Sequence, residues 1–265
     1  MKNKINFKDN ILISGASGMA GSAIVKSLRT AGYGNNNGPG KLLMPSHKEL
    51  DLLDSERVNN WFQKNAPSVV IHAAGKVGGI LANSSQPADF LLENLKMQTN
   101  IIDAAFKSNV KRFLFLGSSC IYPKFSEQPI REESLLSSPL EPTNEWYAIA
   151  KIAGIKLCQS LRIQYGFDAI CLMPTNLYGT NDNYHKNNSH VMASLIRKFH
   201  EAKIRKQDQI LCWGSGLPLR EFMHVDDLGD AVVFALEKWD PQAKNAPLDN
   251  KGLPLTFLNV GTGKD

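Results

Sequence analysis

The sequence lacks several features that would place it among secreted or membrane proteins. Its four cysteines, at positions 120, 158, 171 and 212, are widely spaced and include no C-x-x-C pair. We therefore expect no disulfide framework and no metal site, and a reducing, cytoplasmic environment. No apolar run approaches the ~20 residues that a membrane span requires, and the polar first ten residues are unlike a secretory signal.

An excess of charge of one sign is also missing. The net charge of +5 is mild for 265 residues and is scattered along the chain. The one dense basic cluster, residues 203–206, is more typical of a solvated helix end than of a nucleic-acid-binding patch. We therefore expect no nucleic-acid or membrane partner. A chain of this length can bury a large core, as one domain or as a domain with a smaller lobe.

What the sequence does contain begins with a glycine-rich turn near its start. The apolar run 11–14 is typical of a buried parallel strand, and it leads into Gly15, Gly18 and Gly21 and then a helical pattern. Glycines permit a tight turn and a close approach to a pyrophosphate, which the helix N-terminus attracts. The spacing is G-x-x-G-x-x-G instead of the commoner G-x-G-x-x-G. The strand–turn–helix context predicts nucleotide binding.

A second feature is the pair Tyr147 and Lys151, which follows Ser118 at the end of an expected strand. Residues four apart share a helix face, so the ammonium can lie beside the phenol. A phenol titrates near ~10, and a neighbouring cation lowers that pKa toward the working range. A serine hydroxyl can hydrogen-bond the same substrate oxygen. The trio suits proton transfer at a carbonyl that a nicotinamide reduces, although such a Tyr–Lys pair also occurs by chance on amphipathic helices.

Strand and helix patterns alternate along the chain, which predicts an α/β fold with a doubly wound parallel sheet of the Rossmann type. The rhythm weakens after about residue 175, and the Asn-rich stretch 180–189 is loop-like. We predict a nucleotide-binding domain over 1–178 and a partial, smaller C-terminal substrate lobe over 179–265, interleaved with it. The polar insertion 33–40 has no chemistry that we can assign. The expected strands span 11–14, 41–44, 69–73, 112–116, 169–173 and 256–260, and the expected helices 21–31, 55–65, 87–108, 148–165 and 191–203.

Longer motifs make the sequence recognisable. The glycine turn, the Tyr-x-x-x-Lys pair and the strand-end serine resemble the extended short-chain dehydrogenase/reductase family, and within it the GDP-L-fucose synthases, which act on GDP-4-keto-6-deoxy-D-mannose. The resemblance covers nearly the whole chain in order, and Ser-Ser-Cys-Ile-Tyr-Pro and Asn-Ser-His are its most specific segments. The segments that carry it are 74–80, 116–123, 140–145, 147–154, 173–179, 188–191, 213–216 and 220–227.

The resemblance implies an epimerase and NADPH-dependent reductase with particular residue roles. A 4-keto group acidifies the protons on carbons 3 and 5, so inverting these centres needs an acid and a base. Cys and His are suitable, with ordinary pKa values of about 8.5 and about 6.5. The resemblance gives these roles to Cys120 and His190, which would otherwise be a buried thiol and a surface or capping histidine. Tyr147 would protonate the oxygen on carbon 4, Ser118 would hydrogen-bond that oxygen, and Lys151 would hold the nicotinamide ribose.

The resemblance also implies which residues contact the ligands. Lys198 and Arg220 match positions that contact the substrate diphosphate. Trp213 matches a position whose indole stacks on the substrate, although this indole could equally belong to the core. At position 198 the family often has Arg, whose bidentate fork a lysine lacks. We expect a nucleotide-sugar substrate and a homodimer. The implied substrate contacts are Lys198, Trp213 and Arg220, and the implied cofactor contacts are Gly15, Ala16, Ser17, Gly18, Met19, Ala20, Gly21, Leu116, Gly117, Ser118, Ser119, Lys151, Pro174, Thr175, Asn176, Leu177 and His190.

The residues after the second expected strand favour NADP over NAD. An NAD enzyme usually places Asp or Glu there to bind the ribose 2′-hydroxyl. Here Pro45, Ser46, His47 and Lys48 follow the strand, and the first acid is Glu49. A hydroxyl and two potentially cationic groups suit a 2′-phosphate better. The arginine that some family members carry at the position of Ser17 is absent.

The family segment that residues 258–263 resemble continues into further helices and strands, whereas this sequence stops at Asp265. We expect a fragment or an apparently truncated sugar-nucleotide pocket, with cofactor binding intact and GDP-sugar binding weak. Within the same class, a 4,6-dehydratase would carry Thr-Asp-Glu where this chain has Ser-Cys-Ile, and a 4-epimerase would not need the Cys and His. A non-catalytic NADP-binding protein is the alternative from a different class.

Overall fold

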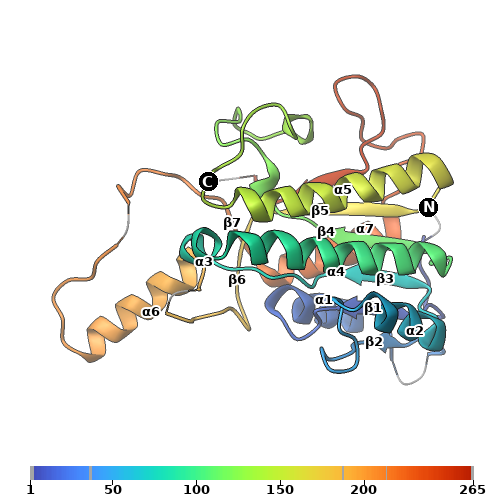
Figure 1. Cartoon of the computed structure of the whole chain (residues 1–265), viewed down its shortest axis with the longest axis horizontal. Helices are drawn as coiled ribbons and strands as arrows, with labels where there is room; N and C mark the ends of the chain where they lie inside the picture. Colours follow the sequence, from blue (N-terminus) through green and yellow to red (C-terminus); the bar gives the residue numbers. More distant parts are fainter. Residues whose placement is uncertain (1–2, 36–37, 187, 213, 264–265) are drawn as a thin grey trace.

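The computed structural model describes residues 3–35, 38–186, 188–212 and 214–263, and a parallel sheet of six strands forms its centre (Figure 1). The strand order is β2-β1-β3-β4-β5-β8, with every neighbouring pair parallel. This confirms the α/β fold expected from the alternating patterns. The strands are β1 (Ile11–Ser14), β2 (Leu42–Leu43), β3 (Val69–His72), β4 (Arg112–Leu116), β5 (Ala169–Pro174) and β8 (Phe257–Val260).

Helices cover both faces of the sheet. On one face α1 (Met19–Thr30) packs against α7 (Val225–Lys238). On the other, α4 (Pro87–Lys107) lies between α2 (Ser55–Asn65) and α5 (Glu145–Tyr165), and Figure 1 shows α4 and α5 running side by side along the sheet. The remaining elements are α3 (Ile80–Ser85), α6 (Val191–Ile204), the 3₁₀ segments Ser119–Ile121 and Glu132–Ser134, and a small parallel pair, β6 (Asn176–Tyr178) and β7 (Phe222–His224).

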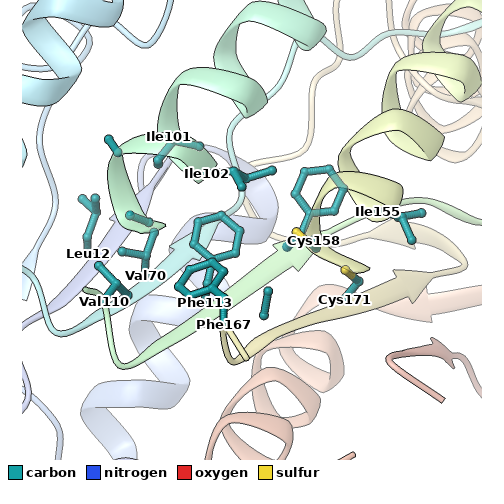
Figure 2. Packing of buried hydrophobic residues seen from close by; sticks show 14 of the residues in the cluster. Leu12, Val70, Ile101, Ile102, Val110, Phe113, Ile155, Cys158, Phe167 and Cys171 are labelled. Carbon is teal, nitrogen blue, oxygen red and sulfur yellow. The ribbon is translucent and has the colours of Figure 1, made fainter. Parts of the chain in front are cut away.

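The core explains why the strands have continuous apolar sequences. Successive side chains of a strand point to opposite faces, and here both faces are covered. Figure 2 shows Leu12, Val70 and Phe113 from three neighbouring strands packed toward Ile101 and Ile102 of α4. The intervening strand residues pack under α1 and α7 in a second cluster. The parallel strands therefore hold the two helical layers at a fixed distance from each other.

The strand order positions a site at one place in the sheet. From β1 the chain moves to β2 on one side and then returns to β3 on the other side of β1. In open sheets of this kind, ligands bind beyond the carboxyl ends of the strands at such a point of reversal. The glycine turn after β1 and the Ser118 segment after β4 both follow carboxyl ends of strands.

The sequence patterns do not predict α3, α7, β6 or β7. For α7 a signal was present: Val225, Leu228, Val232 and Leu236 have helical spacing and are buried. His224 caps the N-terminus of this helix, and its Nδ1 accepts a hydrogen bond from the backbone N–H of Asp226 at 3.2 Å. Both α7 and β8 belong to the main body although they lie after residue 178. The proposed division into 1–178 and 179–265 stays a prediction.

Within the ranges that the structure describes, no helix is long and apolar enough to cross a lipid bilayer. Within those same ranges, no group of three or more His, Cys, Asp or Glu side chains is arranged to hold a metal ion.

A buried arginine joins α7 to the sheet. Arg112 begins β4 and is 0 % exposed. Its guanidinium forms an ion pair with Asp168, which also pairs with Arg162. It donates in addition to the backbone carbonyls of Ala235, at 3.1 Å, and Trp239. One side chain therefore provides donors to a carboxylate and to the last turn of α7.

We predict that Arg112→Met destabilises the fold by about 3–5 kcal/mol, the usual cost of removing one partner of a buried ion pair. The free energy of unfolding from urea denaturation measures this. Lys107→Ala is the control, because the pair between Lys107 and Asp103 is largely exposed and should contribute about 0–1 kcal/mol. Equal effects of the two substitutions would contradict the role given to Arg112.

Candidate active site

The glycine turn after β1 forms a cradle that only glycine can build. Gly15 has φ +76°, and a Cβ there would lie 2.8 Å from the backbone of Ala74. A Cβ on Gly21 would lie 2.0 Å from the Gly15 carbonyl oxygen. Gly18 caps α1 without a side chain, so the N-terminus of that helix stays open to a ligand. Free N–H groups and the helix dipole at this position fit a pyrophosphate. The remaining predicted residues, Ala16, Ser17, Met19 and Ala20, lie in this turn and the first turn of α1.

The Tyr147–Lys151 pair lies in the first half of α5, as its spacing indicated. Lys151 is 4 % exposed and donates from Nζ to the Leu116 carbonyl at 2.9 Å. The same Nζ is 5.8 Å from the Tyr147 ring centroid and 4.9 Å from that of Phe115. Burial lowers the pKa of Lys151 to about 8, and the neighbouring Cys120 opposes this shift. The ammonium is thus fixed at the carboxyl end of β4, beside the phenol.

Ser118 and Cys120 join this pair directly after β4. Ser118 caps the 3₁₀ segment Ser119–Ile121, and the Cys120 thiol donates to its Oγ at 3.1 Å. The Ser118 hydroxyl also acts on Tyr147, where it lowers the pKa of the phenol. The structure therefore brings Ser118, Cys120, Tyr147 and Lys151 into one cluster, which we call the catalytic cluster. Burial raises the pKa of Cys120, while Ser118 and Lys151 act in the opposite direction.

The predicted direction of the Tyr147 pKa shift is wrong. We expected the lysine to lower it, but burial raises the pKa of this phenol, and Cys120 adds to the increase. The desolvation of the phenolate outweighs what a cation 5.8 Å from the ring centroid contributes. A phenol that holds its proton at neutral pH is suited to donate it to a substrate oxygen, which is the direction that a reduction requires.

His190 lies outside the catalytic cluster, at the N-terminus of α6. The residue as a whole is exposed, but neighbouring atoms partly desolvate its ring, which lowers its pKa. The negative charge of Asp182 opposes that shift. The two residues before it approach the loop that follows β3: the Gly79 N–H donates to the Asn188 carbonyl at 3.3 Å. On its other side that loop contacts Phe90, whose ring lies edge to face with Tyr147 at 6.5 Å.

The other predicted cofactor residues line the carboxyl ends of β4 and β5. Gly117 donates to the Leu172 carbonyl at 2.9 Å, and a Cβ there would lie 2.3 Å from the Met173 sulfur. Thr175 and Asn176 donate from their side chains to the Glu221 carbonyl at 3.0 and 2.9 Å. The remaining members of these two segments are Leu116, Ser119, Pro174 and Leu177.

The predicted substrate residues are more widely spread. Lys198 lies on α6 and donates to the Leu211 carbonyl at 3.0 Å. Arg220 is exposed just before β7 and donates to the Leu219 carbonyl at 2.6 Å. Neither belongs to the catalytic cluster. Trp213, the third predicted contact, lies outside the described residues.

Three further residues near the site were not predicted. His72 ends β3, and its Nδ1 lies 2.8 Å from Ser14 Oγ; burial and Lys151 lower its pKa to about 3, so it is neutral. Asn94 is 2 % exposed on α4 and pairs with both backbone groups of Lys76. The Glu221 carboxylate accepts hydrogen bonds from the loop after β8. The polar Asn94 on an otherwise buried helix face was a usable signal. The other two depend on contacts between distant segments.

The lowered pKa of Lys151 gives a pH prediction. Lys151 carries its positive charge below a pH of about 8 and loses it above, while Tyr147 keeps its proton throughout this range. Because the charge stabilises a phenolate that forms when Tyr147 donates, kcat/KM for carbonyl reduction should fall as the pH rises through about 8. The pH profile of kcat/KM reports groups of the free enzyme. A constant kcat/KM between pH 7 and 10 would contradict the assignment.

A parallel sheet with a glycine turn after β1 and a Ser–Tyr–Lys cluster after β4 defines a class of nucleotide-dependent enzymes. Residues 11–247 match the model of the NAD dependent epimerase/dehydratase family. The chain therefore belongs to this family.

Within this family, the chain is similar to GDP-L-fucose synthases and to a reductase of a GDP-linked keto sugar. The chain is 52 % identical over 255 residues to GDP-L-fucose synthase 1 of Arabidopsis thaliana, covering 96 % of this chain and 73 % of that protein. A GDP-6-OMe-4-keto-L-xylo-heptose reductase from C. jejuni superposes with a TM-score of 0.85 at 33 % identity, covering 98 % of this chain and 80 % of that one. A GDP-L-fucose synthetase from Naegleria fowleri, bound to NADP, gives 0.81 at 27 %, covering 98 % and 79 %.

Proposed function

We propose that the chain catalyses the 3,5-epimerisation and NADPH-dependent 4-keto reduction of GDP-4-keto-6-deoxy-D-mannose to GDP-L-fucose. The observation that carries the proposal is the catalytic cluster, in which the Cys120 thiol lies 3.1 Å from Ser118 Oγ beside Tyr147 and Lys151. A plain ketone reduction needs only the Ser, Tyr and Lys. The additional thiol is what an epimerisation next to the same carbonyl requires. The 52 % identity to a protein named GDP-L-fucose synthase supports the same substrate.

The epimerisation steps use Cys120 and His190. Removal of a proton from carbon 3 or carbon 5 gives an enolate whose charge lies on the oxygen at carbon 4. Hydrogen bonds from Ser118 and Tyr147 to that oxygen would stabilise the charge. One of Cys120 and His190 removes the proton, and the other returns a proton to the opposite face. The ordinary pKa values of both side chains lie near neutrality. In the structure that of Cys120 is raised and that of His190 is lowered, so near pH 7 the thiol holds its proton and the imidazole is free to accept one.

The reduction step uses the proton of Tyr147. When bound, NADPH supplies the hydride that reaches carbon 4. Tyr147 donates its proton to the oxygen, Ser118 orients that oxygen, and Lys151 stabilises the phenolate that remains. The Lys151 Nζ also lies next to the loop after β3, where a Cβ on Gly75 would be 3.7 Å from it. A contact to the nicotinamide ribose is the further role that the family resemblance gives this lysine.

The preference for NADP over NAD rests on the segment after β2. Ser46, His47 and Lys48 are exposed next to the strand that pairs with β1. The first acid after the strand, Glu49, already accepts hydrogen bonds from the backbone N–H and the hydroxyl of Ser46, both at 2.8 Å. The Naegleria fowleri relative whose structure contains NADP is consistent with this preference.

A decisive experiment incubates the protein with GDP-4-keto-6-deoxy-D-mannose and follows NADPH absorbance. We expect oxidation of NADPH that depends on the keto sugar, slower oxidation of NADH, and a product identical to GDP-L-fucose by chromatography. The C. jejuni relative, named as a keto-heptose reductase, favours reduction without epimerisation as the second candidate. That candidate would yield the 4-reduced D-sugar from the same incubation. Absence of any NADPH oxidation would contradict both.

We also infer a homodimer and a reducing compartment such as the cytoplasm. Apolar side chains on the outer surfaces of α4 and α5 are exposed, among them Leu92, Trp146 and Ile163 at 53 %, 42 % and 86 %. Symmetric pairing of such surfaces is a common way to cover them. Sedimentation should give a dimer for the native chain and a smaller species for Ile163→Glu. A native chain that sediments as a monomer at micromolar concentration would contradict the dimer.

The inference of a reducing compartment rests on the cysteines. Four free thiols are compatible with such a compartment. They are Cys120, Cys158, Cys171 and Cys212.

A further inference from the structure

Two loops that are far apart in sequence meet beside the catalytic cluster. One is the loop after β3, residues 75–79, and the other is the segment 188–190 before α6. The Gly79 N–H donates to the Asn188 carbonyl at 3.3 Å, and a Cβ on Gly79 would lie only 2.5 Å from the Ser189 carbonyl oxygen. Gly79 has an ordinary φ of −69°, so its backbone angle does not require glycine. The lack of space against Ser189 does.

The loop after β3 is held from its other side by Asn83. This residue of α3 is 6 % exposed, and its Nδ2 donates to the carbonyls of Gly78 and Gly79 at 2.8 and 3.1 Å. A Cβ on Gly78 would lie 3.2 Å from the end of the Phe90 ring, which itself contacts Tyr147. The loop is therefore packed between the wall of the catalytic cluster and the segment that carries His190.

This packing addresses a problem in the proposed mechanism. His190 lies at the end of a polar stretch in which residues 183–186 and 188 are exposed, so little of this stretch is packed against the body of the protein. An acid or base that is misplaced by about 1 Å can lose about 10²-fold in rate. Asn188 and Ser189, which contact Gly79, come directly before His190 in the chain. Their position can therefore set the position of the imidazole.

We propose that Gly79 and Asn83 are positioning residues that fix His190 relative to Cys120. The inference rests on the proposed function, because the role of His190 in epimerisation is part of it. Gly79 acts by leaving room for the Ser189 carbonyl, and Asn83 acts by anchoring the Gly78–Gly79 peptide. Neither needs to touch the substrate. Damage to this contact should therefore impair epimerisation far more than cofactor binding.

Gly79→Ala tests the role of close approach. The added methyl group must displace the Asn188–Ser189 segment, so we expect incorporation of solvent deuterium into the keto sugar to fall by about 10- to 100-fold. The affinity for NADPH, measured by calorimetry, should change far less, because the glycine turn and the segments after β4 and β5 stay in place. Gly38→Ala is the matched control, because a Cβ there would make only ordinary contacts, at 3.5 Å or more, in a remote surface loop.

Asn83→Ala tests the same idea without a clash. It removes the two hydrogen bonds to the loop and should lower deuterium incorporation in the same direction, while circular dichroism and NADPH affinity show that the fold is retained. If both variants exchange deuterium at the rate of the native chain, the inference is wrong.

A third readout separates this inference from the proposed function. Desolvation of the ring by the atoms around it lowers the pKa of His190, and displacement of its segment should return that pKa toward ~6.5. Titration of the His190 imidazole by NMR, with the resonance assigned from His190→Gln, needs no turnover. If the native chain shows no exchange at all, the proposed function fails, and this titration still decides the positioning role. A His190 pKa that is identical in the native chain and in Gly79→Ala would overturn that role.

Discussion

Cys120→Ser should lose most of the deuterium exchange into GDP-4-keto-6-deoxy-D-mannose while binding NADPH as the native chain does. The substitution keeps a hydroxyl within reach of Ser118, so the local packing and the 3₁₀ turn that Ser118 caps are retained. What is lost is the acidity of the thiol, since a serine hydroxyl is a far weaker acid and its alkoxide is not accessible near neutral pH. A positioned acid or base contributes about 10²–10⁴-fold, and we expect a loss of that size.

The measurement is deuterium incorporation at carbons 3 and 5, followed by NMR in D₂O. Cys212→Ser is the control, because Cys212 is exposed and lies outside the catalytic cluster. NADPH affinity is measured in parallel to show that the cofactor site is unchanged. Exchange at the native rate in Cys120→Ser would remove Cys120 from the mechanism.

The second large effect is expected for Tyr147→Phe, which removes the proton donor and keeps the ring packed against Phe90. Carbonyl reduction should slow by about 10²–10⁴-fold. Deuterium exchange into the keto sugar should fall much less, because in the proposed mechanism Cys120 and His190 carry the proton transfers and Ser118 still hydrogen-bonds the enolate oxygen. Tyr165→Phe, near the exposed end of the same helix, is the control.

The two rates in Tyr147→Phe distinguish two roles for the phenol. Loss of reduction alone supports Tyr147 as the proton donor. An equal loss of reduction and exchange would instead mean that its main contribution is to hold the substrate oxygen. Together with Cys120→Ser, this variant divides the reaction into its two halves.

Much of the fold could be predicted from the sequence because its strands and helices are defined by local patterns. The apolar runs 11–13 and 113–116 and the glycine turn between a strand and a helix can each be recognised from a few consecutive residues. Ser118, Cys120, Tyr147 and Lys151 also lie in recognisable local motifs, and the structure brings all four together. Their proximity follows from β4 ending beside the first half of α5.

Other parts of the site depend on contacts that no local pattern contains. Ser14 and His72 pair across 58 residues, and the Glu221 carboxylate binds residues about 40 positions later. The raised pKa of Tyr147 follows from burial, which the spacing of a Tyr and a Lys cannot reveal. The glycine at position 79 is explained only by the carbonyl of Ser189, which approaches it from a distant loop.

The most direct test of the central claim is the isotopic content of the product formed in D₂O from unlabelled GDP-4-keto-6-deoxy-D-mannose and NADPH. Each inverted centre must receive a proton from a solvent-exchanged acid, whereas carbon 4 receives hydride from the cofactor. We predict a GDP-L-fucose that carries deuterium at carbons 3 and 5 and hydrogen at carbon 4. A product with no deuterium on its ring carbons would show that the chain reduces the ketone without epimerisation, and would contradict the role given to Cys120 and His190.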